Sequence, residues 1–444
     1  MIIGGVAAGL AAAMQARRVA PEMEITVLEK TGDISYGACG LPYVISGLIP
    51  SFEQLILHTP DYFRERHNIA VRLHSEALEI WPAKSIVRVR EKEEVRELSF
   101  TGLVIASGAM AVCPPLPGHN LEGVFVLRHL GDGRRLLRYI ESVRPRAVAV
   151  VGAGYIGLEM AEAFRERGLK TTIVEATDRV MSALEGRLRD RIVEELHAHG
   201  VDIIFGEKVV AFEGRAGRVE RVITEAGRTV EAQVVSIGVG VRPCAELAHA
   251  AGLETGTSGA ITTDARQQTS APDIYAAGDC CEVRHLVSGR RVWHPLGQPA
   301  VRQGWVAGTN AAGAGGEARY RGVVGTNVVK VFALEVARTG LALAEAQKEG
   351  FDASSVEVET ASRASYYPGG AKVLTCLVFD RRGRLLGAQM VGREGIAQRI
   401  DVYSAALHAN LKVEDIERFD LAYAPPYAPT IDPILRATHK ASKG

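Results

Sequence analysis

The sequence is poor in cysteine, and its cysteines are not spaced to act together. The six lie at positions 39, 113, 244, 280, 281 and 376, which gives neither metal-ligand spacing nor a dense disulfide framework. This scarcity excludes a small disulfide-stapled secreted domain and fits a chain that works in a reducing cytoplasm. We expect no metal site.

The sequence also lacks an excess of either charge. Lys plus Arg and Asp plus Glu both number 52, so there is no overall electrostatic attraction for nucleic acid or an anionic membrane. The apolar N-terminus has no basic leader and is interrupted by glycines, so we expect neither a signal peptide nor a membrane span. Small molecules are therefore the expected partners, and the length leaves room for about three domains.

The beginning of the chain reads as strand, glycine-rich turn, helix and strand. Ile2-Ile3 precede the turn GGVAAG, and Glu29 follows the turn at the end of the second strand. A dinucleotide needs a tight turn, a helix N-terminus facing its pyrophosphate, and a carboxylate for its ribose hydroxyl. Val6 replaces the second glycine of the usual pattern, and the first strand looks clipped. The candidate residues of this first site are Gly4, Gly5, Val6, Ala7, Ala8, Gly9, Glu29 and Lys30.

A second and fuller copy of this pattern begins at Ala147, in AVAVVGAGYIGLEMAEAFRERG, so the chain contains an internal repeat. The strand TTIVEA then ends in Glu175, a carboxylate that can bind a free 2′-hydroxyl and repel a 2′-phosphate. We therefore predict NADH over NADPH, although Arg179 is near enough in sequence to contact a phosphate. The candidate residues of this second site are Gly152, Gly154, Tyr155, Ile156, Gly157, Glu159, Glu175 and Gly238.

Three later segments add candidate contacts to the first nucleotide. The strand LVIASGA ends in small residues that let a ligand approach the backbone. A second strand leads into Gly278-Asp279, whose carboxylate can accept from hydroxyls, and WHPLGQPA opens a helix. His294 in that last segment is interpreted as structural. The candidate contacts from these segments are Ser107, Gly108, Asp279, Leu296, Gly297 and Ala300.

A single cysteine, Cys39, lies in SYGACGLPY, where the sequence predicts a short helix. Pro42 suits a first helical turn and Gly47 marks the expected end. A thiol at a helix N-terminus is favoured as the thiolate, although a lone cysteine is more often an inert core residue. The two nucleotide sites favour a redox thiol. Because no cysteine lies within five residues of Cys39, its disulfide partner must come from a substrate.

The last third of the chain has alternating strands and a helix but no nucleotide loop. It ends in DLAYAPPYAPTIDPI, whose prolines and tyrosines form a stiff segment. Aromatic hydroxyls on such a segment fit an interface better than an isolated site.

Taken together, the two glycine loops, Gly278-Asp279 and Cys39 resemble the flavoprotein pyridine nucleotide-disulfide oxidoreductases, over essentially the whole chain. The usual CxxxxC pair is missing, so the chain resembles the single-cysteine branch. That branch contains coenzyme A-disulfide reductases, persulfide reductases, and NADH oxidases and peroxidases. SYGACGLPY, HTPDYF, YYPG and YAPPYAPTIDP are most similar to the coenzyme A-disulfide reductases.

The resemblance implies an α/β protein with two Rossmann-like dinucleotide-binding domains, for FAD and NAD(P)H, and a C-terminal α+β dimerisation domain. The expected limits are 1–112 with 250–318 for the FAD domain, 113–249 for the NAD(P)H domain and 319–444 for the dimerisation domain. It also implies a cytoplasmic homodimer.

The resemblance also implies roles for individual residues. Cys39 is the nucleophile that forms a mixed disulfide with coenzyme A, and Tyr367 and Tyr427 come from the partner subunit to the leaving thiol. The positions that correspond to coenzyme A contacts are Gln15, Arg18, Ser35 and His67. Three positions depart from the family pattern, since asparagine, lysine and histidine can stand where this chain has Ala38, His67 and Val301. These departures imply a weaker grip on coenzyme A.

The expected function is electron transfer from NAD(P)H through flavin and Cys39 to a low-molecular-weight disulfide, either coenzyme A disulfide or a coenzyme A persulfide or polysulfide. One alternative is an NADH oxidase in which Cys39 cycles through sulfenic acid with oxygen or peroxide as acceptor. Peroxide is disfavoured because the peroxidases of the branch that this chain resembles carry a histidine in the first glycine-helix region, whereas here no histidine precedes His58. The other alternative is a redox-sensing flavoprotein whose turnover is incidental. Only the disulfide reductase needs Arg18 for turnover, and only the sensor is reoxidised very slowly by every acceptor.

Overall fold

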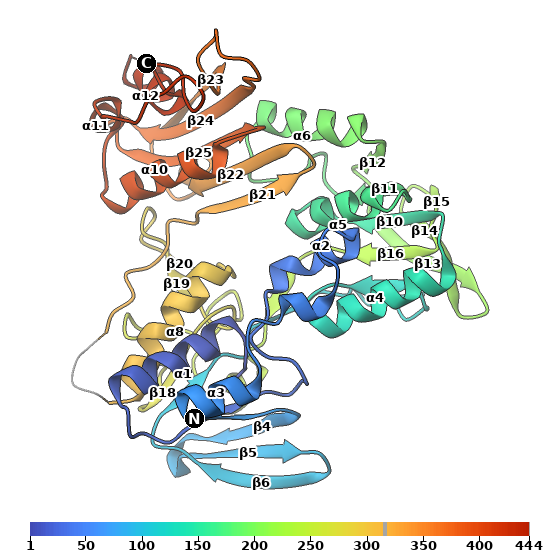
Figure 1. Ribbon diagram of the computed structural model, residues 1–444, viewed down its shortest axis with the longest axis vertical. Coiled ribbons are helices and arrows are strands. Elements are labelled where there is room, and N and C mark those ends of the chain that lie inside the picture. Colours follow the sequence, from blue (N-terminus) through green and yellow to red (C-terminus); the bar gives the residue numbers. More distant parts are fainter. Residues whose placement is uncertain (314–317, 444) are drawn as a thin grey trace.

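The computed structural model describes residues 1–313 and 318–443, and three five-stranded sheets organise them (Figure 1). The first sheet is parallel, with the order β18-β7-β1-β2-β3. Its strands are β1 (Ile2–Ile3), β2 (Ile25–Leu28), β3 (Ile69–Arg72), β7 (Leu103–Ile105) and β18 (Ile274–Ala276). β1 is as short as the sequence indicated, yet it is the central strand. Since β18 comes from much later in the sequence, a distant segment completes this sheet.

The second sheet is also parallel and lies between the parts of the first sheet in sequence. Its order is β12-β11-β10-β16-β9. The strands are β9 (Val124–Val126), β10 (Ala147–Val151), β11 (Lys170–Glu175), β12 (Val201–Phe205) and β16 (Val234–Ile237). Every residue of β10 and β16 is buried, which explains their unbroken apolar runs, as expected for a parallel sheet covered on both faces.

The third sheet is antiparallel and contains the predicted strands of the last third of the chain. Its order is β21-β22-β25-β24-β23. The strands are β21 (Asn327–Val331), β22 (Leu334–Gly340), β23 (Ala353–Ala361), β24 (Lys372–Asp380) and β25 (Leu385–Gly392). The predicted α/β fold with two Rossmann-like halves and a C-terminal α+β unit is therefore confirmed.

Short strands and helices complete the described chain. Two three-stranded sheets contain β4 (Ser75–Trp81), β5 (Ile86–Glu91) and β6 (Glu94–Ser99), and β13 (Val209–Arg215), β14 (Arg218–Thr224) and β15 (Thr229–Glu231). Two strand pairs are β8 (Ala109–Ala111) with β17 (Val241–Pro243), and β19 (Val283–Arg284) with β20 (Arg291–Val292). The α-helices are α1 (Ala7–Val19), α2 (Leu41–Ser46), α3 (Pro60–His67), α4 (Leu130–Val143), α5 (Tyr155–Glu166), α6 (Gly186–Ala198), α7 (Glu246–Ala250), α8 (Gly297–Ala311), α9 (Leu343–Lys348), α10 (Ile396–His408), α11 (Val413–Glu417) and α12 (Pro433–Lys443).

Helices α1 and α8 cross at a distance that only glycine allows. A Cβ at Gly304 would lie 2.3 Å from the Ala8 carbonyl oxygen, and one at Gly308 would lie 2.2 Å from that of Ala12. The two helices lie side by side although residues 20–296 separate them in sequence (Figure 1). This contact joins the two sequence segments that build the first nucleotide site.

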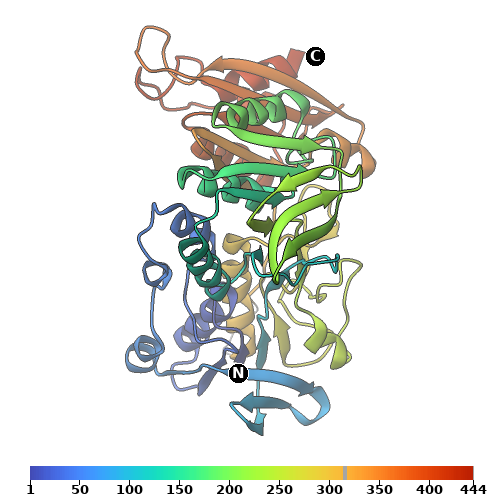
Figure 2. The ribbon, with the colours of Figure 1, turned by 90° about the vertical axis from the view of Figure 1, so that its right-hand side faces the viewer.

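The second parallel sheet and its helices pack against the C-terminal sheet through buried polar contacts as well as apolar ones. Glu162 on α5 pairs with Lys330, and its other oxygen accepts from the Phe332 N–H at 2.7 Å. Glu195 on α6 accepts from the Ala333 N–H at 3.2 Å and from Arg393 at 3.0 Å. These contacts hold α5 and α6 against the C-terminal region, as both ribbon views show (Figures 1 and 2).

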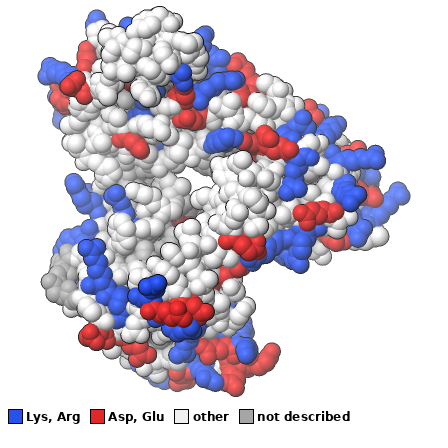
Figure 3. Space-filling view, in the orientation of Figure 1, with Lys and Arg blue, Asp and Glu red and all other residues white. Residues whose placement is uncertain are grey.

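One face of the molecule carries side chains of both charges among uncharged residues (Figure 3). The face seen in Figure 3 intersperses Lys and Arg with Asp and Glu and shows no continuous field of one sign. Among the helices that the structure describes, none has the length and apolar character needed to cross a bilayer.

Candidate active site

The first glycine turn joins β1 to α1 and is too tight for side chains. Gly4 has a φ of +107°, and a Cβ there would lie 2.2 Å from the Ala106 carbonyl oxygen. A Cβ at Gly9 would lie 1.9 Å from the carbonyl oxygen of Gly4. Val6, the N-cap of α1, makes no side-chain cap, so the first N–H groups of the helix are left for a ligand.

A buried carboxylate faces this turn from the end of β2. One oxygen of Glu29 accepts from the Gly5 N–H at 2.9 Å. The other oxygen accepts from the N–H and the hydroxyl of Thr31, each at 2.8 Å. These bonds fix the carboxylate beside the turn, where a ribose hydroxyl can donate to it.

The second glycine turn repeats this construction contact by contact. Glu175 accepts from the Ala153 N–H at 2.7 Å, and from the N–H and hydroxyl of Thr177 at 2.8 and 2.9 Å. A Cβ at Gly157 would lie 2.0 Å from the Gly152 carbonyl oxygen. The chain therefore has two equivalent nucleotide cradles.

Sequence reasoning missed the threonine of each cradle. Thr31 and Thr177 both follow their glutamate by two residues, in Glu-Lys-Thr and Glu-Ala-Thr. The same spacing in both copies could have predicted that each threonine binds its glutamate.

The other predicted nucleotide contacts lie where strands and helices of the two halves end. Lys30 follows Glu29 and is exposed. Tyr155 and Ile156 are exposed at the start of α5, and Gly238 follows β16 beside Gly157. Ser107 and Gly108 follow β7, and the Ser107 hydroxyl donates to the Cys244 carbonyl at 2.6 Å. Leu296 is the N-cap of α8, which makes no side-chain cap, and Gly297 and Ala300 lie in its first turn.

An ion pair that the sequence did not predict joins the two halves at Asp279. An Arg128 guanidinium nitrogen lies 2.6 Å from the Asp279 carboxylate, and Nε of Arg128 donates to the Ala109 carbonyl at 3.0 Å. Trp293 Nε1 donates to the Asp279 carbonyl at 2.8 Å. Arg128 therefore places a positive charge among the predicted flavin contacts.

His294 is largely buried beside the start of α8. Burial, and then the nearby His285 and Arg338, lower its pKa to about 4. Its Nε2 is buried without a hydrogen-bond partner in the described chain.

Cys39 lies in a 3-10 turn, Ala38–Gly40, that leads directly into α2. The predicted first-turn Pro42 and terminal Gly47 are confirmed, and Gly47 has a φ of +90°. The α-helix itself begins at Leu41, which is buried in the same apolar core as Leu158 of α5. Packing of α2 on α5 thus fixes the turn that carries the exposed cysteine.

The protein groups around Cys39 do not favour its thiolate, contrary to the expectation from a helix N-terminus. Desolvation by the surrounding protein raises the pKa of Cys39, and Glu159 and then Asp279 raise it further. Arg128 acts in the opposite direction. The preceding 3-10 turn and the short helix α2 provide too small a dipole to outweigh these effects.

Glu159 carries the strongest charge that acts on the Cys39 thiol. It lies on α5, one helical turn before Glu162. Burial, and then the Glu162 carboxylate, raise the pKa of Glu159 to about 7. Glu162 is paired with Lys330 and the Phe332 N–H, so Glu159 is the carboxyl of the two whose ionisation is disfavoured.

The predicted substrate residues lie on three segments, with Gln15 and Arg18 on α1, His67 at the end of α3 and Ser35 in the loop before Cys39. Gln15 donates to Thr309 at 3.1 Å, and Arg18 is exposed at the end of α1. His67, at the end of α3, packs against Tyr62, and its Nε2 is buried without a partner in the described residues.

Two further contacts complete this region. Arg17 Nε donates to the His67 carbonyl at 2.9 Å and ties the two helices together. Ser35 is buried under the loop that leads to Cys39, and its carbonyl accepts from the Leu57 N–H at 2.7 Å.

The two predicted tyrosines lie on the C-terminal region and are exposed. Tyr427 is 78% and Tyr367 is 37% exposed. The connection from β23 to β24, which carries Tyr367, lies at the end of the molecule away from α2 in both ribbon views (Figures 1 and 2). Within one chain, these tyrosines and Cys39 are not brought together.

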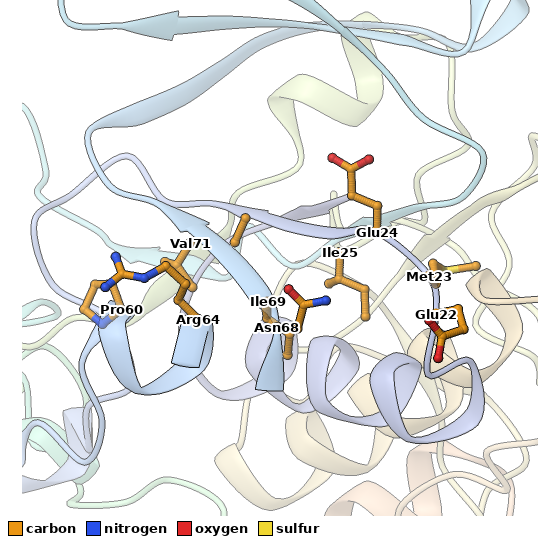
Figure 4. A pocket seen from close by; sticks show the side chains of 10 residues that line it. Glu22, Met23, Glu24, Ile25, Pro60, Arg64, Asn68, Ile69 and Val71 are labelled. Atoms are coloured by element: carbon orange, nitrogen blue, oxygen red, sulfur yellow. The ribbon is translucent and has the colours of Figure 1, made fainter. Parts of the chain in front are cut away.

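A hollow of about 360 Å³ lies at the other end of the first sheet from its glycine turn (Figure 4). Glu22, Arg64 and Asn68 line it around the starts of β2 and β3. It therefore takes no part in the cysteine site. In the described ranges no three His, Cys, Asp or Glu side chains are grouped to hold a metal ion.

Comparison with known families settles the class of this chain. The model of the pyridine nucleotide-disulphide oxidoreductases matches residues 1–304, and that of their dimerisation domain matches residues 326–433. The chain belongs to the pyridine nucleotide-disulphide oxidoreductases. It is thus an NAD(P)H-dependent flavoprotein of the disulfide reductase family, whose cofactors are FAD and NAD(P)H.

Individual relatives cover nearly the whole chain. It is 40% identical over 437 residues to an NAD(P)H sulfur oxidoreductase (CoA-dependent) of Pyrococcus abyssi, covering 98% of this chain and 96% of the relative. An NADH oxidase of Methanocaldococcus jannaschii is 36% identical, with 100% and 98% covered. The solved structure of an NAD-dependent persulfide reductase from A. fulgidus has a TM-score of 0.96 at 35% identity, with 100% and 82% covered.

The residues present fit both cofactors. The turns at Gly4 and Gly152 leave no space for side chains, and each faces a carboxylate and an uncapped helix N-terminus. The N-terminus of α8 offers a further set of free N–H groups beside Asp279. Backbone donors at these positions suit pyrophosphates and the polar edge of a flavin.

Proposed function

We propose that this protein reduces a small disulfide, coenzyme A disulfide or a coenzyme A persulfide or polysulfide, with electrons from NAD(P)H. The observation that carries the proposal is the exposed Cys39 turn, held by α2 against α5 between the two nucleotide cradles. No second cysteine stands near it in sequence, so a substrate sulfur is the partner that completes a disulfide. The coenzyme A dependence named for the Pyrococcus relative supports this substrate class.

Cys39 acts as the nucleophile in the proposed cycle. Its thiolate attacks one sulfur of the substrate, the S–S bond breaks, and the first thiol leaves. FAD, when bound, relays the two electrons that NADH supplies as a hydride. The mixed disulfide at Cys39 accepts these electrons, and the second thiol is released. Over one cycle, NADH, one proton and the disulfide become NAD⁺ and two thiols.

The side chains around the sulfur stabilise charge in this cycle. Arg128 favours the Cys39 thiolate, and its ion pair with Asp279 keeps it in place. Tyr367 and Tyr427 donate hydrogen bonds to the leaving thiolate of the other protomer in a homodimer. The match to a dimerisation domain supports the assembly, and the exposure of both rings supports their role.

Four residues are proposed to hold the coenzyme A part of the substrate. Arg18 is the phosphate ligand because it is exposed and makes no ion pair within the described residues, and Gln15 lies one helical turn before it. Ser35 supports the loop of Cys39, and the ring of His67, packed against Tyr62, contributes a contact surface. The compartment we propose is a reducing cytoplasm, since all six cysteines are free thiols.

NADH is the proposed reductant in preference to NADPH. Glu175 occupies the position that Glu29 occupies in the first cradle, with the same three donors. Arg179 is paired with Asp178, which reduces its availability to a 2′-phosphate. A carboxylate fixed in this position repels that phosphate.

The proposed domain limits follow the sheets. The FAD domain consists of residues 1–112 and 250–318, the NAD(P)H domain of 113–249 and the dimerisation domain of 319–444. Residues 314–317 and 444 fall within these limits but lie outside the described residues.

Replacing Cys39 by serine tests the proposal. We expect Cys39→Ser to retain FAD, to be reduced by NADH at the normal rate, and to lose turnover with coenzyme A disulfide. Full disulfide reductase activity in this variant would refute the proposal. Mass spectrometry of the wild-type protein as isolated adds a direct check, because it distinguishes a coenzyme A adduct, an oxidised sulfur and a free thiol at Cys39.

An NADH oxidase is the second candidate, favoured by the Methanocaldococcus relative. Arg18→Ala separates the two functions. The variant should raise the KM for coenzyme A disulfide about tenfold or more if Arg18 holds a phosphate. Oxygen consumption with NADH should not change, because oxygen needs no nucleotide-binding residue.

A further inference from the structure

A buried arginine in the C-terminal region binds both segments that carry the exposed tyrosines. Arg399 lies on α10, and its side chain is 9% exposed. Its Nε lies 3.0 Å from the Asp432 carboxylate. One terminal nitrogen donates to the Gly395 carbonyl at 3.2 Å, and the other donates to the Ser362 and Tyr427 carbonyls, both at 3.1 Å. All three nitrogens of the guanidinium therefore donate hydrogen bonds.

The acceptors belong to different segments of the chain. Ser362 begins the connection from β23 to β24, which leads to Tyr367. Tyr427 and Asp432 belong to the segment between α11 and α12. The two segments lie side by side in Figure 2, and Arg399 crosses between them below their surface.

The segments also touch each other directly. The Ala364 N–H donates to the Pro425 carbonyl at 3.3 Å, and the hydroxyls of Tyr366 and Tyr423 lie 3.0 Å apart. The two tyrosines are exposed, whereas Ala364 is buried. Of the side-chain contacts between the segments, that of Arg399 is the buried one, so water competes least with its bonds.

A second arginine stiffens the first segment from the other side. Arg363 pairs with Glu394, which also accepts from the Ser362 hydroxyl at 2.5 Å. The Arg363 guanidinium lies 5.9 Å from the centroid of the Tyr367 ring, within reach of a cation–π contact. Two arginines thus hold the start of the segment that carries Tyr367.

A buried ion pair usually adds little net stability compared with a well-packed apolar pair, because both charges lose their water. What it can add is a fixed arrangement of the surrounding groups, since the planar guanidinium can donate well to only one arrangement of acceptors. In this protein the arrangement fixes the spacing between the backbone carbonyls of Ser362 and Tyr427.

We propose that Arg399 is a positioning residue that sets the spacing of Tyr367 and Tyr427 and so aims both hydroxyls at the thiol leaving the other protomer. The inference rests on the proposed function, in which these tyrosines serve that thiol. It extends that function, because it assigns the rigidity of the tyrosine pair to one side chain that touches neither substrate nor cofactor.

The test is a double-mutant cycle measured on the FAD-loaded enzyme. Arg399→Lys keeps the charge but cannot reach all the acceptors of the fork. We expect it to lower kcat for coenzyme A disulfide about tenfold or more, as for other displaced catalytic groups, with KM little changed. Electron transfer from NADH to ferricyanide, which needs only the nucleotide and flavin sites, should keep its rate.

The second arm uses Tyr367→Phe/Tyr427→Phe as the background. If Arg399 acts through the two hydroxyls, Arg399→Lys should lower kcat by less than about twofold in that background. Equal losses with and without the hydroxyls would show a general structural role and overturn the inference. Should the two Phe substitutions alone leave disulfide turnover intact, the proposed role of the tyrosines fails, and the inference fails with it.

Two further variants guard against a folding defect. Arg338→Lys is the matched control, because Arg338 is another largely buried arginine of the C-terminal region, bonded to Glu345 and the Gly340 carbonyl but to neither tyrosine segment. It should leave disulfide turnover unchanged. Asp432→Asn is the milder perturbation of the same site, since its oxygen can still accept from Arg399. It should give a smaller loss of kcat with the same dependence on the hydroxyls, and additivity in its cycle would also refute the inference.

Discussion

Replacing Glu159 by glutamine should stabilise the protein above neutral pH and make Cys39 more acidic. Burial and Glu162 raise the pKa of Glu159 from an ordinary 4.5 to about 7. At about 1.36 kcal/mol per pH unit, this difference corresponds to roughly 3 kcal/mol of unfavourable ionisation in the folded state. The penalty is absent below pH 4.5, grows as pH rises through the folded pKa of about 7, and is complete above it.

The free energy of unfolding is the first measurement. At pH 8 we expect Glu159→Gln to exceed the wild type by up to about 3 kcal/mol in urea unfolding, whereas the two should agree near pH 4.5. Glu166→Gln is the matched control. It lies two helical turns further along α5 but is exposed, so it should show no such pH dependence.

The second measurement is the rate at which iodoacetamide alkylates Cys39 as a function of pH. Because the Glu159 charge raises the pKa of Cys39, its removal should move the midpoint of that profile to lower pH. A midpoint that stays in place or moves upward would refute the reasoning. So would a variant that is no more stable than the wild type at pH 8.

Three other substitutions test separate parts of the structure. Glu175→Gln should raise the ratio of kcat/KM for NADPH to that for NADH about tenfold, because it removes the carboxylate that faces the 2′ position; an unchanged ratio contradicts the NADH assignment. The pKa of His294 is depressed to about 4, so its neutral form contributes stability that is lost as pH falls from about 6.5 toward 4. His294→Leu should therefore lose less stability than the wild type between pH 7 and pH 5 in urea unfolding, and an equal loss would exclude His294 as the cause. Gly308→Ala places a Cβ 2.2 Å from the Ala12 carbonyl oxygen and should cost about 1–3 kcal/mol and weaken FAD retention, seen as a lower Tm and faster FAD loss on dilution. Normal retention would show that α1 and α8 can separate freely.

The features that sequence could predict are local ones. The turns at Gly4 and Gly152 and the helix end at Gly47 follow from neighbouring residues, because backbone conformation dictates glycine there. The strands of the C-terminal sheet can likewise be recognised in the sequence as apolar runs.

The features that sequence could not predict depend on contacts between distant segments. Arg128 and Asp279 are 151 positions apart, and nothing near either residue indicates the other. Arg399 donates to the carbonyl oxygens of Ser362 and Tyr427. Every residue type has a backbone carbonyl, so the sequence does not indicate which ones accept these bonds. The raised pKa of Cys39 was missed for the same reason, since its strongest charged neighbour is Glu159 on another helix.

The glycine-lined contact between α1 and α8 has a consequence for the order in which the chain folds during synthesis. α1 is made before the second parallel sheet, whereas Gly304 and Gly308 emerge only after the whole of that sheet has been made. That sheet is continuous in sequence and can fold as a unit while the first one still lacks β18. The alanine-rich face of α1 therefore stays uncovered until α8 has emerged. The nascent chain is expected to complete its second parallel sheet before its first, although the first sheet begins earlier in the sequence.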